Sequence, residues 1–274
     1  MSFFAINQET CKRDGICAKD CPAQVIVWKN KDDFPMPAKD AEEFCINCGH
    51  CVAVCPYGAL TLSMMPVDTC PSVQKDALTN PAAIRHFLTS RRSIRQYKKA
   101  PVPHDLLNEM IDTARHAPTG SNKQQVHWMV FENPADVNRF AALVIDFIGL
   151  TLPFINDDAL AKRMKRIIVS WDNGEDRIMR GAPNLILVHS QADLPFAEAD
   201  CVIALTYLEL YAYAHGLGTC WAGYFTTASN MHAPLIEALG LPAGHRCYGA
   251  LMLGYPKYKY KRIPQRNAAL TTWR

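Results

Sequence analysis

Residues 45–56 read Cys45-Ile46-Asn47-Cys48-Gly49-His50-Cys51-Val52-Ala53-Val54-Cys55-Pro56. This C-x2-C-x2-C-x3-C-P spacing is the one with which bacterial chains hold a cubic iron–sulfur cluster by three thiolates. In such a run the fourth cysteine points away and ligates a second cluster. Cys55 therefore predicts a sister site elsewhere in the chain.

The sister run lies upstream, at residues 11–22. It reads Cys-Lys-Arg-Asp-Gly-Ile-Cys-Ala-Lys-Asp-Cys-Pro and matches the first run position for position, except that Asp14 stands where the second cysteine would be. The crossed rule assigns the ligands of two clusters. One cluster is predicted at Cys45, Cys48, Cys51 and Cys21, and the other at Cys11, Asp14, Cys17 and Cys55.

Asp14 makes the two predicted clusters unequal. A carboxylate is a harder donor than a thiolate, so the iron beside it is held less firmly. We therefore expect a 4Fe-4S cluster at the site with Cys48, and either a 4Fe-4S or a 3Fe-4S centre at the site with Asp14. The alternative is that Asp14 is a turn residue before Gly15, because Asp-Gly is a common turn pair.

Composition narrows the class of protein. A chain of 274 residues that is 49% hydrophobic can bury a large core and form one or two domains. The net charge of +3 gives no strong case for a polyanionic partner. The eleven cysteines are odd in number and crowd into the first part of the chain, which indicates metal ligands in a reducing cytosol rather than disulfides.

No export signal or membrane segment is predicted. The start, MSFFAINQETC, has no basic flank before an apolar stretch of signal-peptide length, and no later segment of 18 residues is apolar throughout. We therefore expect a cytoplasmic protein.

The pattern divides the chain into residues 1–65, a linker at 66–81 and a larger domain at 82–274. Short strands are expected at 24–28 and 59–62, each after the cysteine–proline of a run. Pro66, Pro71 and Pro81 mark the linker, where Cys70 is interpreted as a structural residue.

The larger domain alternates helices and strands. A helix is expected from Pro103 to Ala114, and strands at 126–131, 184–188 and 248–253. The stretch Phe196–His215 is apolar almost all round, so we expect it to be buried in the core or against another subunit.

Three pieces of this domain indicate a cofactor site. Arg91-Arg92-Ser93-Ile94-Arg95 is expected to end a helix that begins near Ala82, which would place Arg91 and Arg95 one turn apart for a shared phosphate. Ala117–Gln124 is a polar turn that can present amides to a planar heterocycle. Taken alone, each is also typical of a solvated basic face or a plain loop.

The third piece is Gly216-Leu217-Gly218-Thr219-Cys220-Trp221-Ala222-Gly223, where glycines let the backbone approach a ligand. Trp221 occupies the last glycine position of G-x-G-x-x-G, so no Rossmann site is predicted. A basic segment, Lys-Tyr-Lys-Tyr-Lys-Arg at 257–262, offers phosphate ligands. One short patch does not favour nucleic-acid binding.

Together with Leu-Gly-Tyr-Pro at 253–256, these pieces occur in an order that resembles the nitroreductase family of FMN flavoproteins. With the cysteine runs, residues 9–266 resemble ferredoxin–nitroreductase fusions. The resemblance implies an α+β fold: a small bacterial-ferredoxin-like domain, then an α+β FMN domain with a central, mostly antiparallel sheet. It also implies a homodimer with FMN at the subunit interface.

The resemblance implies roles for individual residues. The expected cofactor-binding residues are Arg91, Arg92, Ser93, Arg95, Asn122, Gln124, Cys220, Trp221, Ala222, Gly223, Lys261 and Arg262. Arg91, Ser93 and Arg95 would hold the phosphate, the ribitol and the pyrimidine edge, and Arg262 and Lys261 would complete the phosphate cage. Asn122 and Gln124 would face the ring, and Cys220 to Gly223 would line it near N5. The Ala222 N–H would donate to flavin N5. Cys220 is interpreted mainly as a small space-filling residue, and Trp221 equally as a core residue or a substrate contact.

No side-chain acid–base pair is apparent, which agrees with a reaction carried by the flavin. Each cluster carries one electron, and flavin-driven reductions proceed in two-electron steps. We therefore expect electrons to pass through two clusters to FMN and on to a nitroaromatic, quinone or activated alkene.

Two alternatives remain open at this point. In one, NAD(P)H reduces FMN and the clusters carry electrons outward, toward an external ferredoxin or reductase. In the other, the protein is a non-enzymatic electron relay or redox sensor.

Overall fold

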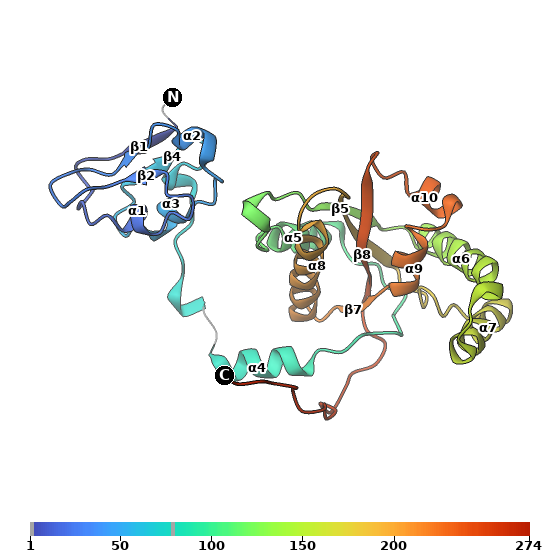
Figure 1. Ribbon diagram of the computed structural model, residues 1–274. Coiled ribbons are helices and arrows are strands. Elements are labelled where there is room, and N and C mark those ends of the chain that lie inside the picture. Colours follow the sequence, from blue (N-terminus) through green and yellow to red (C-terminus); the bar gives the residue numbers. More distant parts are fainter. Residues whose placement is uncertain (1–2, 78–79) are drawn as a thin grey trace. The chain divides into compact units, whose positions relative to one another are not determined.

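The computed structural model describes residues 3–77 and 80–274. Leu78 and Thr79, in the expected linker 66–81, lie outside the described residues. The chain divides into two compact units: residues 1–79 with 121–123, and residues 80–120 with 124–274. Figure 1 shows short strands and helices in the first unit and a helix-covered sheet in the second. The predicted α+β fold class is confirmed.

The first unit is built from two small two-stranded sheets and short helices. The two pairs are antiparallel, β1 with β4 and β2 with β3. The elements are β1 (Phe4–Ile6), α1 (Ile16–Lys19), β2 (Ile26–Val27), β3 (Met36–Pro37), α2 (Ala41–Phe44), α3 (His50–Val54) and β4 (Leu60–Leu62). As expected, β2 and β4 each follow the cysteine–proline of a run. Two 3₁₀ turns, η1 (Val67–Thr69) and η2 (Lys75–Ala77), follow β4.

The two cysteine runs have the same backbone conformation. Arg13 and Asn47, at matching positions, have positive φ of 56° and 50°. Gly15 and Gly49 have φ of 69° and 73°, and α1 and α3 begin at the next residue. A side chain rarely adopts such φ, so glycine suits both positions. The run that contains Asp14 therefore keeps the shape of the all-cysteine run.

The second unit is organised on a four-stranded antiparallel sheet in the order β5-β6-β8-β7. Its strands are β5 (His127–Phe131), β6 (Asn184–Gln191), β7 (Gly218–Trp221) and β8 (His245–Gly254). Its helices are α4 (Pro81–Ser90), α5 (His104–Ala114), α6 (Pro134–Thr151), η4 (Leu152–Phe154), α7 (Asp158–Asp172), α8 (Ala197–Ala214), α9 (Gly223–Ala228) and α10 (Ala233–Leu239). The 3₁₀ turn η3 (Gly120–Asn122) lies where the chain is divided between the units.

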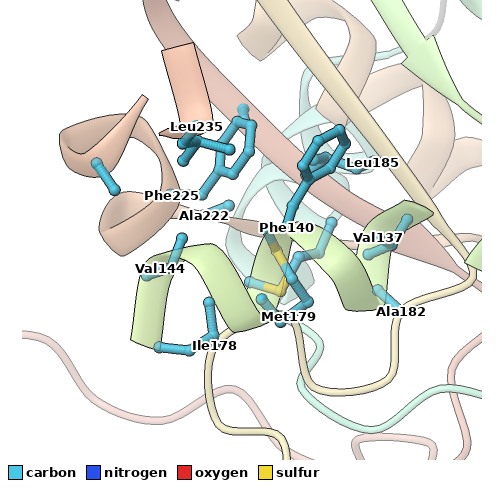
Figure 2. Close-up of a cluster of buried hydrophobic side chains, with 14 of the residues drawn as sticks. Val137, Phe140, Val144, Ile178, Met179, Ala182, Leu185, Ala222, Phe225 and Leu235 are labelled. Carbon is cyan, nitrogen blue, oxygen red and sulfur yellow. The ribbon is translucent and has the colours of Figure 1, made fainter. Parts of the chain in front are cut away.

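Helices cover both faces of this sheet. Leu185 and Leu187 of β6 belong to a buried cluster with Phe140 of α6 and Phe225 of α9, part of which Figure 2 shows. Alternate residues of the same strand face a second cluster formed with α5 and α8. Because both faces are covered, β6 reads as a continuous apolar run, as expected for a central strand.

Helix α6 is an apolar helix of 18 residues. The segment formed by α6 and η4 has a mean hydropathy of 1.5. Among the described residues, it is the one helical segment that is both long enough and apolar enough to span a membrane. Core helices of globular proteins pass the same test. Its side chains at Phe140, Val144 and Ile148 are buried in the first cluster, so this face of the helix belongs to the core.

Helix α8 is only partly covered within one chain. Leu205, Leu208 and Ala212 are fully buried, whereas Ile203 and Tyr207 are 37% and 43% exposed. The expected burial of the whole apolar helix therefore holds for one face. The other face is open in the single chain.

Three histidines lie together on neighbouring strands of the sheet. The ring centroids of His189 are 5.2 Å from His127 and 5.1 Å from His245. The Nδ1 atoms of His189 and His245 are 2.9 Å apart, so one ring donates and the other accepts. His189 is 5% exposed, and burial, followed by the charges of His127 and His245, lowers its pKa to about 4.

This low pKa predicts a pH-dependent stability. The unfolded chain binds a proton on His189 at an ordinary pKa of about 6.5, whereas the folded chain resists it down to about 4. The contribution of neutral His189 to the free energy of unfolding is therefore fully present above pH ~6.5 and is lost as the pH falls toward the folded pKa. Between pH 7 and pH 5, wild type should lose ~2 kcal/mol of unfolding free energy more than His189→Gln does. Urea unfolding followed by tryptophan fluorescence measures this, and equal losses in the two chains would contradict it.

Candidate functional site

Four of the predicted cluster ligands lie around one small cavity in the first unit. Cys21, Cys45, Cys48 and Cys51 all line a cavity of about 20 Å³. Burial, followed by the charges of the other three cysteines, raises the pKa of Cys51 to about 11. Cys21 comes from the upstream run, so the grouping follows the crossed assignment.

The second predicted site groups in the same crossed way. Burial raises the pKa of Cys17 to about 11, and the neighbouring charges of Cys55 and Cys11 add to the rise. Asp14 is exposed, and its Oδ1 accepts a hydrogen bond from the Ile16 N–H at 3.1 Å. Asp14 thus supports the start of α1, as the turn alternative expected. Ligation by Asp14 stays a prediction.

The donor set and its surroundings fit iron–sulfur clusters. In the described part of the chain, no three His, Cys, Asp or Glu side chains converge as they would around one metal ion. A cubane differs, because each of its irons takes one thiolate and the sulfurs stand farther apart. The cysteines pack against Phe4, Leu60 and Leu62. Such an apolar shell limits water access and influences cluster potential.

In the second unit, the segment Arg91–Arg95 is extended, and the prediction that it ends a helix is wrong. Helix α4 ends at Ser90, and Arg91 has φ −58° and ψ 138°. The Ile94 N–H donates to the Thr219 carbonyl oxygen at 2.8 Å. The unpaired edge of β7 offers this partner, and the segment pairs with it instead of continuing the helix. Arg91 and Arg95 are therefore not one helical turn apart.

Three of the four sequence motifs meet along this edge. Beyond Ile94, the Lys98 N–H donates to Tyr255 and the Lys257 N–H donates to Gln96, at 2.8 and 2.9 Å. Gly218 permits the approach, because a Cβ there would lie 2.3 Å from Ile94 Cγ1. The motifs at 91–95, 216–223 and 253–256 thus form one structure.

Glu209 lies at the centre of this arrangement, and the sequence did not identify it as a site residue. Its side chain, on α8, is buried. Oε1 accepts from Arg91 Nη1 at 3.2 Å and from Thr219 Oγ1 at 2.9 Å, and Oε2 accepts from Trp221 Nε1 at 3.4 Å. The available signal was an acid between Leu208 and Leu210, in the apolar part of the helix that follows Asp200.

Arg180 is a second residue that the sequence did not identify. It lies in the turn before β6 with a positive φ of 58°. Burial raises the pKa of the Cys220 thiol, and the charges of Arg95, Arg180 and Arg91 oppose that rise. Arg180 and Arg95 likewise oppose the rise in the pKa of Tyr97. Three guanidinium groups therefore act on the Cys220 loop, which makes this a favourable place for an anion.

Ala222 anchors the loop in the core. Its side chain is 3% exposed and belongs to the cluster that includes Phe140 and Phe225 (Figure 2). The Ala222 N–H donates to the Ala250 carbonyl oxygen at 2.9 Å. The amide expected to donate to flavin N5 therefore already has an acceptor, and a bond to N5 would have to be shared. Gly223 begins α9, where the first N–H groups have no acceptor within the helix.

Trp221 follows the buried Cys220 and is 36% exposed. Its ring packs over Gly249, where a Cβ would lie 2.9 Å from Trp221 Cζ3. The tryptophan is thus neither a core residue nor a loose surface residue. Its ring packs against Gly249, and the rest of the side chain is partly exposed to solvent.

The turn at 117–124 contains unusual backbone. Ser121, Asn122 and Gln124 have positive φ of 50°, 53° and 52°. Such conformations cluster at functional sites. The Gly120 N–H donates to Asp200 Oδ1 of α8 at 3.0 Å. Residues 121–123 group with the first unit, so the placement of Asn122 and Gln124 at a flavin ring stays a prediction.

The remaining predicted phosphate ligands lie in a separate group. Arg92, Lys261 and Arg262 line a cavity of about 630 Å³ between α4 and the C-terminal segment. Arg91, Ser93 and Arg95 do not line it. Arg92 donates from Nη1 to the Arg91 carbonyl oxygen at 2.7 Å, while its buried Nε has no partner among the described residues. Part of the expected phosphate cage therefore lines this cavity, and part does not.

The sequence matches two family models. Residues 88–255 match the nitroreductase family, and residues 9–60 match a 4Fe-4S dicluster domain. A Thermus thermophilus protein named NADH dehydrogenase is 30% identical in an alignment of 201 residues that covers 67% of this chain and 92% of that protein.

Solved structures show the same fold in the larger unit. A nitroreductase with bound FMN from Desulfitobacterium hafniense is 24% identical, with a TM-score of 0.55, over 70% of this chain and 96% of that chain. A second, from Bacteroides fragilis, is 22% identical, with a TM-score of 0.54, over 71% of this chain and 98% of that chain.

Proposed function

The chain belongs to the nitroreductase family, with a 4Fe-4S dicluster domain at its N-terminal end, and from this premise we propose that it is an FMN-dependent oxidoreductase supplied by iron–sulfur clusters. Electrons pass through the two clusters to FMN and on to a small electrophile such as a nitroaromatic, a quinone or an activated alkene. The observation that carries the proposal is the meeting of the Arg91–Arg95 segment with the Cys220 loop. In the solved relatives that share this fold, the bound group is FMN.

The chain's own residues supply charge and position. When bound, the flavin supplies two-electron reduction and each cluster a one-electron step. Arg91, Arg95 and Arg180 favour an anionic phosphate and an electron-rich ring in their midst. Ala222 holds the loop rigidly in the core, and a site on rigid support keeps its geometry. The raised pKa of Cys220 keeps its thiol protonated, which agrees with a space-filling role.

A homodimer is part of the proposal. The open face of α8, with Ile203 and Tyr207 exposed, supports a second subunit at that surface. Lys261 and Arg262, which line a cavity that Arg91 does not line in the single chain, would then belong to the same dimeric site as Arg91.

Anaerobic reduction tests the proposed direction of electron flow. The purified protein is first assayed for iron, sulfide and FMN, and an external low-potential donor then reduces the clusters while flavin absorbance is followed. We expect the flavin to bleach together with the clusters, because covalent fusion raises the local donor concentration to roughly millimolar. If the flavin stays oxidised while the clusters bleach, the proposed electron transfer from the clusters to FMN is wrong.

A second function has a specific observation in its favour, the name NADH dehydrogenase of the Thermus thermophilus relative. In that case NAD(P)H reduces FMN, and the clusters carry electrons outward to an external ferredoxin or reductase. Anaerobic addition of NADH separates the two, because only this second route bleaches the flavin before the clusters.

A further inference from the structure

We propose that Glu209 is a positioning residue that sets both the geometry and the charge of the cofactor site. It acts through Arg91 and Trp221 and need not touch the cofactor itself. This inference rests on the proposed FMN site.

The first argument is the burial of the carboxylate. Glu209 is 5% exposed, and a buried carboxylate is costly unless opposite charge and hydrogen bonds meet it. Arg91 supplies the charge and lies with Nη1 3.2 Å from Oε1. Thr219 and Trp221 supply the other two hydrogen bonds. Both oxygens are therefore used, which fixes the carboxylate in one orientation.

The second argument is which residues the carboxylate holds. Arg91 comes from the first motif, and Thr219 and Trp221 come from the third, far along the chain. An ion pair that served only to attach α8 to the sheet would need none of these particular side chains. Glu209 instead joins an expected phosphate ligand to an expected wall of the ring pocket.

The third argument is the donor capacity that remains on Arg91. Within the described residues, its guanidinium donates to Glu209 through Nη1 alone. A guanidinium carries five N–H donors in a fixed fork. Because Glu209 fixes Nη1, the guanidinium of Arg91 has one orientation and its remaining N–H donors point in set directions. Less side-chain entropy is then lost when an anion binds.

The fourth argument is electrostatic. The charge of Glu209 reaches the Cys220 loop, where it raises the pKa of the thiol while Arg95, Arg180 and Arg91 lower it. A carboxylate near a flavin disfavours the added electrons of the reduced ring. Removing this charge should therefore shift the flavin midpoint potential to more positive values.

The test compares Glu209→Gln with wild type in the full-length protein. Glutamine keeps the shape and an acceptor oxygen but removes the charge. FMN is removed, and FMN and riboflavin are titrated back by flavin fluorescence, while the midpoint potential is measured by dye equilibration. Glu198→Gln is the matched control, because Glu198 lies on the same helix and is exposed.

In Glu209→Gln, the Kd for FMN should rise about tenfold, which corresponds to ~1.4 kcal/mol. Riboflavin, which has no phosphate for Arg91 to hold, should be affected less, and the potential should move upward. Glu198→Gln should match wild type in all three. If Glu209→Gln does not fold, Thr219→Val removes one of the three hydrogen bonds and should raise the Kd about threefold.

Contrary outcomes are distinguishable. If wild type binds FMN and Glu209→Gln has the same Kd and potential, Glu209 is structural only and this inference is overturned while the proposed function stands. An unchanged Kd in a folded Thr219→Val variant overturns it in the same way. If wild type binds no FMN, both the inference and the proposed function fall.

Discussion

Replacing Cys48 with alanine is expected to stop electron delivery to the flavin while leaving FMN bound. Cys48 lines the cavity shared with Cys21, Cys45 and Cys51, so the substitution removes one of four thiolates from a cluster. Mutating residues that only hydrogen-bond to metal ligands already lowers metal affinity or activity by about 10–100-fold. Loss of a ligand itself should therefore slow electron transfer to the flavin by at least ~100-fold. Stopped-flow absorbance of the flavin, with iron and sulfide assays, measures this.

Two further variants make the experiment specific. Cys70→Ala is the matched control, because Cys70 is a half-buried thiol of the same unit that belongs to neither run. It should transfer electrons at the wild-type rate. Cys21→Ala should lose the same cluster as Cys48→Ala, although Cys21 comes from the other run. Loss of different clusters in the two variants would refute the crossed assignment. Normal electron transfer in Cys48→Ala would refute the proposed path from the clusters to FMN.

Gly218→Ala is expected to lower stability and weaken FMN binding together. The new Cβ would lie 2.7 Å from Ile94 Cβ and 2.3 Å from its Cγ1, too close to the backbone for the isoleucine to rotate away. The Arg91–Arg95 segment must move off the edge of β7. Overpacking of this kind costs about 1–3 kcal/mol, and we expect ~2–3 kcal/mol in urea unfolding and at least a tenfold rise in the Kd for FMN.

Controls separate this effect from a general cost of alanine. Gly149 lies on α6, and beyond its chain neighbours and the backbone of its own helix, a Cβ at this position would have none of the described residues within 4 Å. Gly149→Ala should be neutral or stabilise the protein by up to ~1 kcal/mol, because glycine disfavours a helix. Ile94→Ala added to Gly218→Ala should restore part of the lost binding by relieving the clash. If Gly218→Ala keeps wild-type stability and affinity, then the close approach of the two segments does not matter to the site.

The sequence was most informative where a pattern is local. The spacing of the cysteines predicted two matching loops, and Gly15 and Gly49 adopt matching conformations. The apolar run at 184–188 predicted a central strand, and β6 is central. Such features depend on neighbouring residues alone, so periodicity and turn chemistry are sufficient.

The sequence failed where a residue's partner lies far along the chain. The Arg91–Arg95 segment looked like a helix end, because nothing local reveals that Ile94 pairs with Thr219. Glu209 and Arg180 were missed for the same reason, since their importance comes from tertiary neighbours. The Ala222 amide is a third case, because its bond to Ala250 depends on how β7 leaves the sheet.

Helix α8 carries a second buried acid besides Glu209. Asp200 is 9% exposed and holds the Gly120 amide, so one rigid helix fixes both the turn at 117–120 and the Arg91–Trp221 pair. An inserted residue between the two acids would rotate one against the other by roughly 100°, since a turn takes about 3.6 residues. Among natural relatives, insertions should therefore accumulate in the loops on either side of α8 and be purged from the interval between positions 200 and 209.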